Sequence, residues 1–181
     1  MELIDLHTHS TYSDGTLTPV EIIKLAEEIN LKAVALTDHD TVSGIDDFLN
    51  CKNNLVEKVP GVEISVEMKD FNFHMVGLFI EKNNGIIEEK LEILKRERAN
   101  RNIKIINKLN EIGFEISIDE LKKIAGEQLG RPHIAFLLHK KGYVYSPEEA
   151  FEKYLSKGKV AYFDKFRYSF VPMIKIILQV Y

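Results

Sequence analysis

The fold is decided by residues 1–19, which read MELIDLHTHSTYSDGTLTP. The short apolar run 3–6 predicts a buried β-strand, with His7 and His9 at its carboxyl end. Because alternate residues of a strand point the same way, both imidazoles can reach a single metal ion. A His-x-His pair also occurs by chance in loops, so this pair alone leaves a metal site and an ordinary loop both open.

Strand and helix patterns alternate beyond this stretch. Thr18 can cap a helix that begins at Pro19, and Glu21 completes a capping box. Further strands are predicted at 33–36, 59–66 and 73–79, with a helix at about 44–56. Strand, helix and strand at this spacing are typical of a βαβ unit, which predicts a parallel sheet with helices outside it.

The chain changes in character after residue 84. Residues 86–112 are charged and helix-periodic, which indicates one amphipathic helix or a helical pair, and Ser117 with Glu120 forms a second capping box. Helices are also predicted at 132–141 and 146–157, a strand at 160–163, and a helix or strand at 171–180. We therefore expect the first part of an α/β domain over 1–84, a helical insertion over 85–158, and a return to the domain over 159–181.

Acidic and histidine residues recur with each successive strand. Asp14 follows the first strand, His39 follows the second, Glu63 lies in the third and His74 begins the fourth. The strand ends of a parallel α/β barrel or open sheet converge on one rim, so we expect these side chains to meet there. Imidazole and carboxylate donors without thiolates suit Zn, Mn or Fe, and two or three such ions can activate water for attack on a phosphate ester.

Other uses of these acidic residues stay open. Glu63 is our candidate for a carboxylate that bridges two ions, although its apolar neighbours also permit an outward-facing glutamate paired with a lysine. Asp38 and Asp40 commonly serve in turns or helix caps, so His39 is favoured as a ligand over either of them.

A second candidate feature is Gly130-Arg131-Pro132-His133, at the start of a predicted helix. The planar guanidinium of Arg131 matches a phosphate, and exposed amides at a helix N-terminus favour an anion. These residues predict a phosphate clamp opposite the metals. Alternatively, Arg131 forms a surface ion pair and His133 is a packed or solvated helix residue.

Composition restricts the class of protein. The chain has 181 residues, of which 45% are hydrophobic, and a net charge of −4, so it lacks the global basic field of proteins that grip long duplex nucleic acid. The single Cys51 excludes an intramolecular disulfide. We see no secretory signal, and the apolar run 171–181 is far shorter than the about 20 residues that cross a bilayer. We expect a soluble, cytoplasmic protein that does not bind membranes.

The elements DLHTHSTYSDGTLTP, ALTDHDTVSG, PGVEIS, the strand around His74 and GRPHIA occur in an order that resembles the PHP (polymerase and histidinol phosphatase) superfamily, in particular its stand-alone phosphoesterases. The resemblance implies a distorted β/α barrel with a helical insertion. It implies hydrolysis of phosphate esters by two or three metal ions. Substrate classes in such families include nucleoside 3′,5′-bisphosphates, short oligonucleotides processed from the 5′ end, and histidinol phosphate.

The resemblance also implies roles for individual residues. It makes metal ligands of His7, His9, Asp14, His39, Glu63 and His74, and it gives catalytic roles to His39, Glu63, Arg131 and His133, the last two facing the substrate phosphate. Family members continue beyond the equivalent of 174–178 with further ligands, whereas this sequence stops at Tyr181. We therefore expect a C-terminally incomplete barrel with fewer ions, either as a truncated product or fragment or as a homo-oligomer that covers the open sheet edge.

The leading interpretation is a metal-dependent phosphoesterase that acts on a phosphorylated small molecule or a short single-stranded nucleic acid through a metal-activated water. The alternative is a catalytically silent metal- or nucleotide-binding remnant, because C-terminal ligands are missing. A third interpretation is an amidohydrolase, since His-x-His on a first strand also opens that site. Asp14 and the TDHD turn favour the PHP type over an amidohydrolase.

Overall fold

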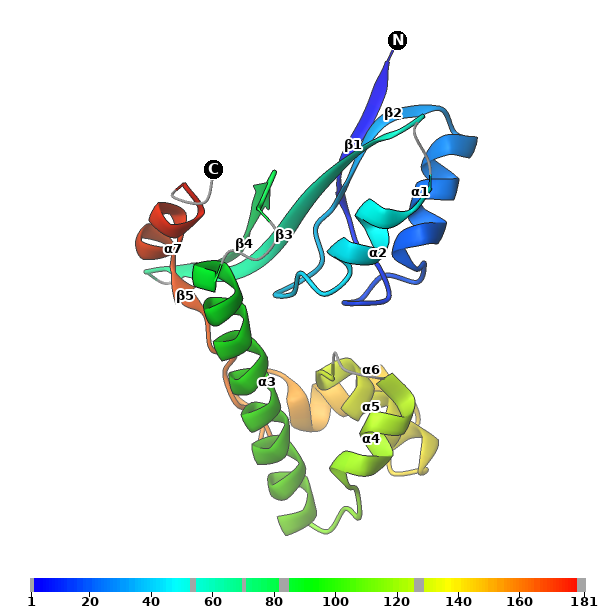
Figure 1. Cartoon of the computed structure of the whole chain (residues 1–181). Helices are drawn as coiled ribbons and strands as arrows, with labels where there is room; N and C mark the ends of the chain where they lie inside the picture. The colour runs from blue at the N-terminus through cyan, green and yellow to red at the C-terminus, as the bar shows by residue number, and fades with distance from the viewer. Residues whose placement is uncertain (1, 53–54, 70, 82–84, 126–128, 179–181) are drawn as a thin grey trace. The chain divides into compact units, whose positions relative to one another are not determined.

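The structure is a computed structural model that describes residues 2–52, 55–69, 71–81, 85–125 and 129–178 (Figure 1). The chain divides into two compact units. Unit 1 comprises Met1–Leu94 with Arg167–Tyr181, and unit 2 comprises Lys95–Phe166. The boundaries between the units fall after residues 94 and 166, further along the chain than the expected boundaries after residues 84 and 158. The expected division of the domain stays a prediction.

Unit 1 is built on a five-stranded sheet. Its strands are β1 (Leu3–Thr8), β2 (Leu31–Leu36), β3 (Glu57–Met68), β4 (Phe71–Leu78) and the short β5 (Tyr168–Ser169). The expected parallel pairing is confirmed for β1, β2 and β3. It is wrong for β4, which pairs antiparallel with β3. The connection between β3 and β4 is only two residues long, whereas a parallel crossover needs a dozen or more.

Helices α1 (Pro19–Glu28) and α2 (Ile45–Asn50) cover one face of the β1–β3 part of the sheet (Figure 1). The predicted capping box is confirmed, because the Glu21 carboxylate accepts the Thr18 amide at 2.8 Å and Thr18 accepts the Glu21 amide at 3.3 Å. A core forms between these helices and β2, centred on Ile23, Val34, Leu36, Ile45 and Phe48. Helix α2 is shorter than predicted, because the backbone already leaves the helical conformation at Cys51. Residues 53 and 54 of the predicted helix lie outside the described residues.

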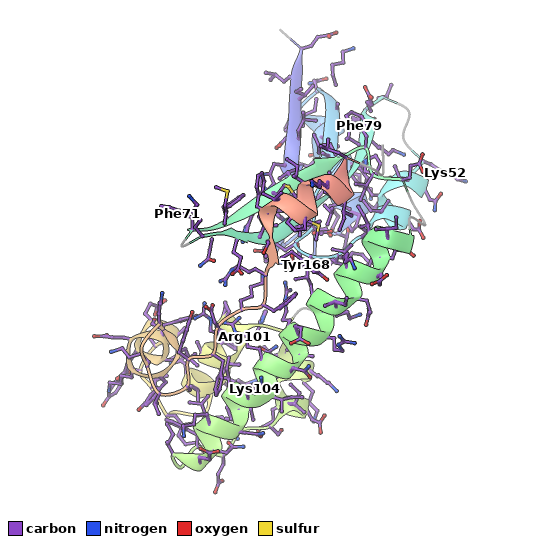
Figure 2. All side chains as sticks on the ribbon, turned by 90° about the vertical axis from the view of Figure 1, so that its left-hand side faces the viewer. Lys52, Phe71, Phe79, Arg101, Lys104 and Tyr168 are labelled. Atoms are coloured by element: carbon purple, nitrogen blue, oxygen red, sulfur yellow. The ribbon has the colours of Figure 1, made fainter. Side chains whose placement is uncertain are left out.

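A second core lies along β3. Val62, Ile64 and Val66 pack there with the start of α3 (Gly85–Glu111) and with α7 (Phe170–Ile177), which lies over the β3–β4 strands (Figure 2). Because side chains alternate along a strand, Glu63 and Ser65 point to the opposite face. The alternation of apolar and polar residues in β3 therefore places one apolar face on a core and one polar face towards the candidate site.

The predicted burial of β1 is wrong. Leu3 is 53% and Ile4 is 58% exposed. Among the described strands β1 pairs only with β2, so it forms one edge of the sheet. An edge strand lacks the neighbour that buries a central strand, which explains why an apolar run is exposed here.

Unit 2 is helical. It contains the rest of α3, which is a single helix rather than a pair, followed by α4 (Ile118–Ala125), α5 (Arg131–Lys140), α6 (Pro147–Ala150) and the π-helical turn η1 (Phe151–Leu155). Its core is centred on Ile105, Leu109, Leu121, Ile134, Leu138 and Leu155. The capping box of Ser117 and Glu120 is confirmed at the start of α4.

The strand predicted at 160–163 is wrong. The backbone turns there, because the Ala161 amide donates to the Tyr154 carbonyl at 3.0 Å and the Tyr162 amide donates to the Lys159 carbonyl at 3.0 Å. These bonds fold the segment back onto η1 instead of extending it along a sheet. In the part of the chain that the structure covers, no helix is both long and apolar enough to cross a membrane.

Candidate metal centre

Four histidines surround the carboxylate of Glu63 in unit 1. The distances to Glu63 Oε2 are 2.8 Å from His7 Nε2, 3.0 Å from His9 Nε2 and 3.3 Å from His39 Nδ1, and His74 Nδ1 lies 2.8 Å from Oε1. Glu63 is only 4% exposed. The alternative of an outward-facing glutamate paired with a lysine is therefore wrong, and Glu63 with its four histidines and Asp14 is called the Glu63 cluster below.

The backbone explains how these side chains meet. His7 lies on β1 and His9 follows it, so the carboxyl end of the first strand delivers both imidazoles, as predicted. His39 follows β2 and forms an isolated parallel bridge with Glu63 on β3. His74 arrives by a different route, since the β3–β4 hairpin sets it opposite Ser65, the next residue on the same face as Glu63.

Asp14 completes the cluster from the exposed side. Its carboxylate lies 3.6 Å from His9 Nδ1 and 3.6 Å from His39 Nε2, and the rings of these two histidines stack at 4.5 Å. The loop that carries Asp14 depends on Gly15. A Cβ atom at this position would lie 2.0 Å from the His9 carbonyl oxygen, so only glycine fits.

The electrostatics of the cluster favour an ionised Glu63. Burial alone would raise the pKa of this carboxyl, but the hydrogen bond with His7 and the charges of His39 and His74 outweigh it and lower the pKa. Burial lowers the pKa of His39, which favours its neutral form. An ionised Glu63 and a neutral His39 are the states in which these two groups can bind a metal ion.

The donors of the cluster fit divalent metal ions. Within the described residues, three overlapping groups have donor atoms within 4.8 Å of one another: His7, His9 and Glu63; His9, Asp14 and His39; and His39, Glu63 and His74. His39 Nδ1 is buried and, although it lies 3.3 Å from Glu63 Oε2, it makes no hydrogen bond with the residues that the structure describes. A buried nitrogen without a partner is costly unless something else occupies its lone pair. Nitrogen and oxygen donors without sulfur suit Zn, Mn or Fe.

Asp38 and Asp40 lie beside the cluster but belong to none of these groups within the described part of the chain. Both are buried, at 2% and 3% exposure, and both accept hydrogen bonds from serines. The preference for His39 over either aspartate as a candidate donor agrees with this arrangement. The sequence pattern gave no sign that the two aspartates would be buried.

Arg131 and His133 lie in unit 2. Arg131 donates from Nη1 to the Leu155 carbonyl at 2.9 Å, and its guanidinium carbon lies 5.8 Å from the Phe151 ring centre and 5.5 Å from that of Tyr162. It forms no ion pair with the residues that the structure describes. His133 accepts the Gly130 amide at Nδ1, 3.2 Å away, and burial lowers its pKa. Their contact with a substrate phosphate stays a prediction.

The sheet and the Glu63 cluster together define a class, namely α/β proteins in which strands and adjoining loops carry histidines and carboxylates suited to divalent metal ions. The PHP domain family matches residues 5–158, and the chain belongs to this family.

Individual relatives agree with this assignment. A 5′-3′ exoribonuclease of Haemophilus influenzae is 36% identical over 159 residues, which cover 87% of this chain and 58% of that protein. A 3′,5′-nucleoside bisphosphate phosphatase of Chromobacterium violaceum is 32% identical over 165 residues, with coverages of 90% and 58%. The chain thus spans a little over half the length of these curated relatives.

A solved structure confirms the PHP type of α/β fold. The crystal structure of a proposed metal-dependent phosphoesterase from Bifidobacterium adolescentis superposes with a TM-score of 0.83 at 26% identity, and the match covers 98% of this chain and 63% of that one.

Proposed function

We propose that the protein is a metal-dependent phosphoesterase that hydrolyses phosphate esters of a nucleotide or a short oligonucleotide. The observation that carries the proposal is the approach of four imidazoles to the buried carboxylate of Glu63, at 2.8 to 3.3 Å. So many donors around one carboxylate are suited to bind cations rather than to stabilise a core. The relatives named an exoribonuclease and a nucleoside bisphosphate phosphatase support a phosphate ester as substrate.

The chain's own residues would divide the work. His7, His9, Asp14, His39, Glu63 and His74 would hold two or three divalent ions, or fewer, with Glu63 shared between two of the donor groups. Bound ions would supply Lewis-acid activation of water and would neutralise charge on phosphoryl oxygens. Arg131 would donate to the substrate phosphate, because its planar fork matches phosphate oxygens. His133 would contact the same phosphate.

The proposed substrate is small or single-stranded. A net charge of −4 gives no extended basic field, so an anionic ligand must be held locally by the ions and a few arginines. The two relatives named above act, by their names, on an RNA and on a nucleoside bisphosphate. Both carry phosphate esters of a nucleoside, which is the common chemistry that we propose for this chain.

The test is turnover by the purified protein after metal removal and reconstitution with Mn²⁺, Zn²⁺ or Fe²⁺. A nucleoside 3′,5′-bisphosphate reports release of phosphate, and a 5′-phosphorylated oligoribonucleotide reports release of mononucleotides. We expect metal-stimulated hydrolysis of at least one of them. The variant His9→Ala should abolish it, whereas His139→Ala is the matched control, because this exposed histidine lies outside the cluster.

The absence of turnover on both substrates would contradict the proposed activity. If the protein then still bound metal or nucleotide, the catalytically silent binding protein would be the better description. Metal identity, metal count and a homo-oligomer belong to the same proposal, and elemental analysis together with the mass in solution tests them. A cytoplasmic location stays a prediction.

A further inference from the structure

The carboxylate of Asp38 ties the loop after β1 to the end of β2. Its Oδ1 accepts the Ser10 amide at 2.7 Å and the Ser13 hydroxyl at 2.6 Å, and its Oδ2 accepts the Ser10 hydroxyl at 2.6 Å. Ser10 follows His9 directly and Ser13 precedes Asp14 directly. Three short hydrogen bonds from one buried carboxylate therefore hold the loop segment that presents two candidate metal ligands.

The carboxylate of Asp40 ties the turn after β2, residues 37–40, to β3. Its Oδ1 accepts the Ser65 amide at 2.9 Å and its Oδ2 accepts the Ser65 hydroxyl at 3.2 Å. The backbone adds two bonds to Glu63, because the Asp40 amide donates to the Glu63 carbonyl at 2.8 Å and the Glu63 amide donates to the Asp38 carbonyl at 3.2 Å. Ser65 is also the residue that pairs with His74 across the hairpin.

The backbone at Asp40 is unusual in itself. Its φ of +53° lies in the left-handed region, which a non-glycine residue adopts at a cost unless other contacts fix it. Asparagine and aspartate tolerate this region better than other side chains. The turn is therefore held by the hydrogen bonds of Asp40, and His39 lies between two buried anchors.

We propose that Asp38 and Asp40 are positioning residues that set His39 and Glu63 at the spacing required for divalent cations. The proposal rests on the proposed metal site. Asp38 fixes the loop that carries His9 and Asp14, and Asp40 fixes the turn against the backbone of Glu63. Neither aspartate is assigned contact with an ion or a substrate.

The test measures metal affinity without substrate, by titration of the metal-free protein with Mn²⁺ and Zn²⁺ in the presence of a competing chelator. Loss of residues that orient metal ligands typically lowers affinity about 10- to 100-fold, and we expect such a drop for Asp40→Ala and for Asp38→Ala. Asp40→Asn keeps an acceptor for the Ser65 amide and tolerates the left-handed backbone. The metal affinity of Asp40→Asn should stay within about threefold of that of the native protein.

The control is Asp119→Ala, because Asp119 is an exposed carboxylate on α4 in unit 2 and belongs to none of the hydrogen bonds described above. It should leave metal affinity unchanged. Equal losses for Asp40→Asn and Asp40→Ala would overturn the proposal, since they would mean that the charge rather than the anchoring matters. Native affinity in Asp40→Ala would overturn it as well.

Folding is checked by circular dichroism of the metal-free variants. If Asp40→Ala does not fold, Ser65→Ala decides, because it removes the hydroxyl partner of Asp40 and keeps the backbone bond. A drop in metal affinity of about threefold, the size expected for one lost hydrogen bond, supports anchoring, and an unchanged affinity overturns it. Because no substrate is involved, a protein that binds metal but lacks turnover would refute the proposed activity alone.

Discussion

His74 Nδ1 lies 2.8 Å from Oε1 of Glu63, although the two residues belong to neighbouring antiparallel strands. The other three histidines approach the second carboxylate oxygen, Oε2. His74 is therefore the histidine of the Glu63 cluster that lies beside Oε1 rather than Oε2. Glu63 thereby belongs to two of the three groups of candidate metal donors, one with His7 and His9 and one with His39 and His74.

The first prediction concerns this histidine. His74→Ala removes a nitrogen donor from the group with His39 and Glu63 and leaves the groups that contain His9 intact. We expect the metal content to fall by about one ion per chain, with one ion retained, which elemental analysis after dialysis would measure. Asn72→Ala, an exposed change on the same face of β4, is the control. Full metal content in His74→Ala would argue against a ligand role.

The second prediction concerns Gly15. Gly15→Ala forces the loop away, because the added Cβ would lie 2.0 Å from the His9 carbonyl oxygen. His9 and Asp14 should then lose their common orientation, so metal affinity should fall about tenfold or more. Gly85→Ala is the matched change, since a Cβ there meets no atom of the described residues within 4 Å. Titration with a competing chelator measures the metal affinity of both variants. Equal metal affinities for Gly15→Ala and Gly85→Ala would show that the loop accommodates the Cβ without displacing His9 and Asp14.

The sequence was sufficient for several local elements and for selecting the side chains that the structure brings together around Glu63. The capping boxes at Thr18 and Ser117 specify their helices through bonds between residues three apart, so they can be recognised without knowledge of the fold. The spacing of His7 and His9 places both imidazoles near one strand end for the same local reason. These features depend on neighbours along the chain.

Features that depend on distant partners were not predictable. His74 was expected to join the others at the rim of a parallel sheet, but it arrives through a hairpin whose two-residue connection was not recognised as a turn. The apolar run of β1 resembles a buried strand, and only its edge position explains its exposure. In the sequence, Asp38 and Asp40 resemble the aspartates of an ordinary turn. Their burial depends on hydrogen bonds from serines that lie 28 and 25 residues away, respectively.

The third prediction is a pH dependence in unit 2. Burial holds the pKa of His133 below its ordinary value of 6.5. As the pH falls below about 6.5, the unfolded chain binds a proton at this residue before the folded chain does. The contribution of His133 to stability is therefore complete above pH 6.5 and decreases as the pH falls towards the lower pKa of the folded state. The acceptor bond from the Gly130 amide also requires a neutral Nδ1.

His133→Gln isolates this effect. Glutamine does not titrate, and at the third helical position its carbonyl can still accept the Gly130 amide, as in a capping box. Urea unfolding of the metal-free proteins between pH 8 and pH 5.5 measures the difference in free energy of unfolding. Relative to that of the native protein, the free energy of unfolding of the variant should rise as the pH falls, because only the native protein has a titrating side chain at position 133. Parallel curves would contradict the assignment.

The last prediction concerns how Arg131 is held. Its guanidinium lies near the rings of Phe151 and Tyr162, and its hydrogen bond satisfies the Leu155 carbonyl at the end of η1. A cation–π contact that is partly removed from water contributes about 1 kcal/mol, and the buried ring surface adds to this. Tyr162→Leu should therefore lower the free energy of unfolding by about 1 to 2 kcal/mol. Tyr162→Phe keeps the ring and removes the hydroxyl that donates to Asp164. This variant should lower the free energy of unfolding by about 0.5 kcal/mol.

The same pair of variants separates a structural role of Arg131 from contact with substrate. If Arg131 donates to the substrate phosphate, Tyr162→Leu should raise KM about fivefold with little change in kcat, because a misplaced guanidinium weakens binding. Phe136→Leu controls for loss of an aromatic ring, since Phe136 lies on the same helix with an exposed side chain. A Tyr162→Leu protein with lowered stability but an unchanged KM would mean that Arg131 serves only to close the end of η1.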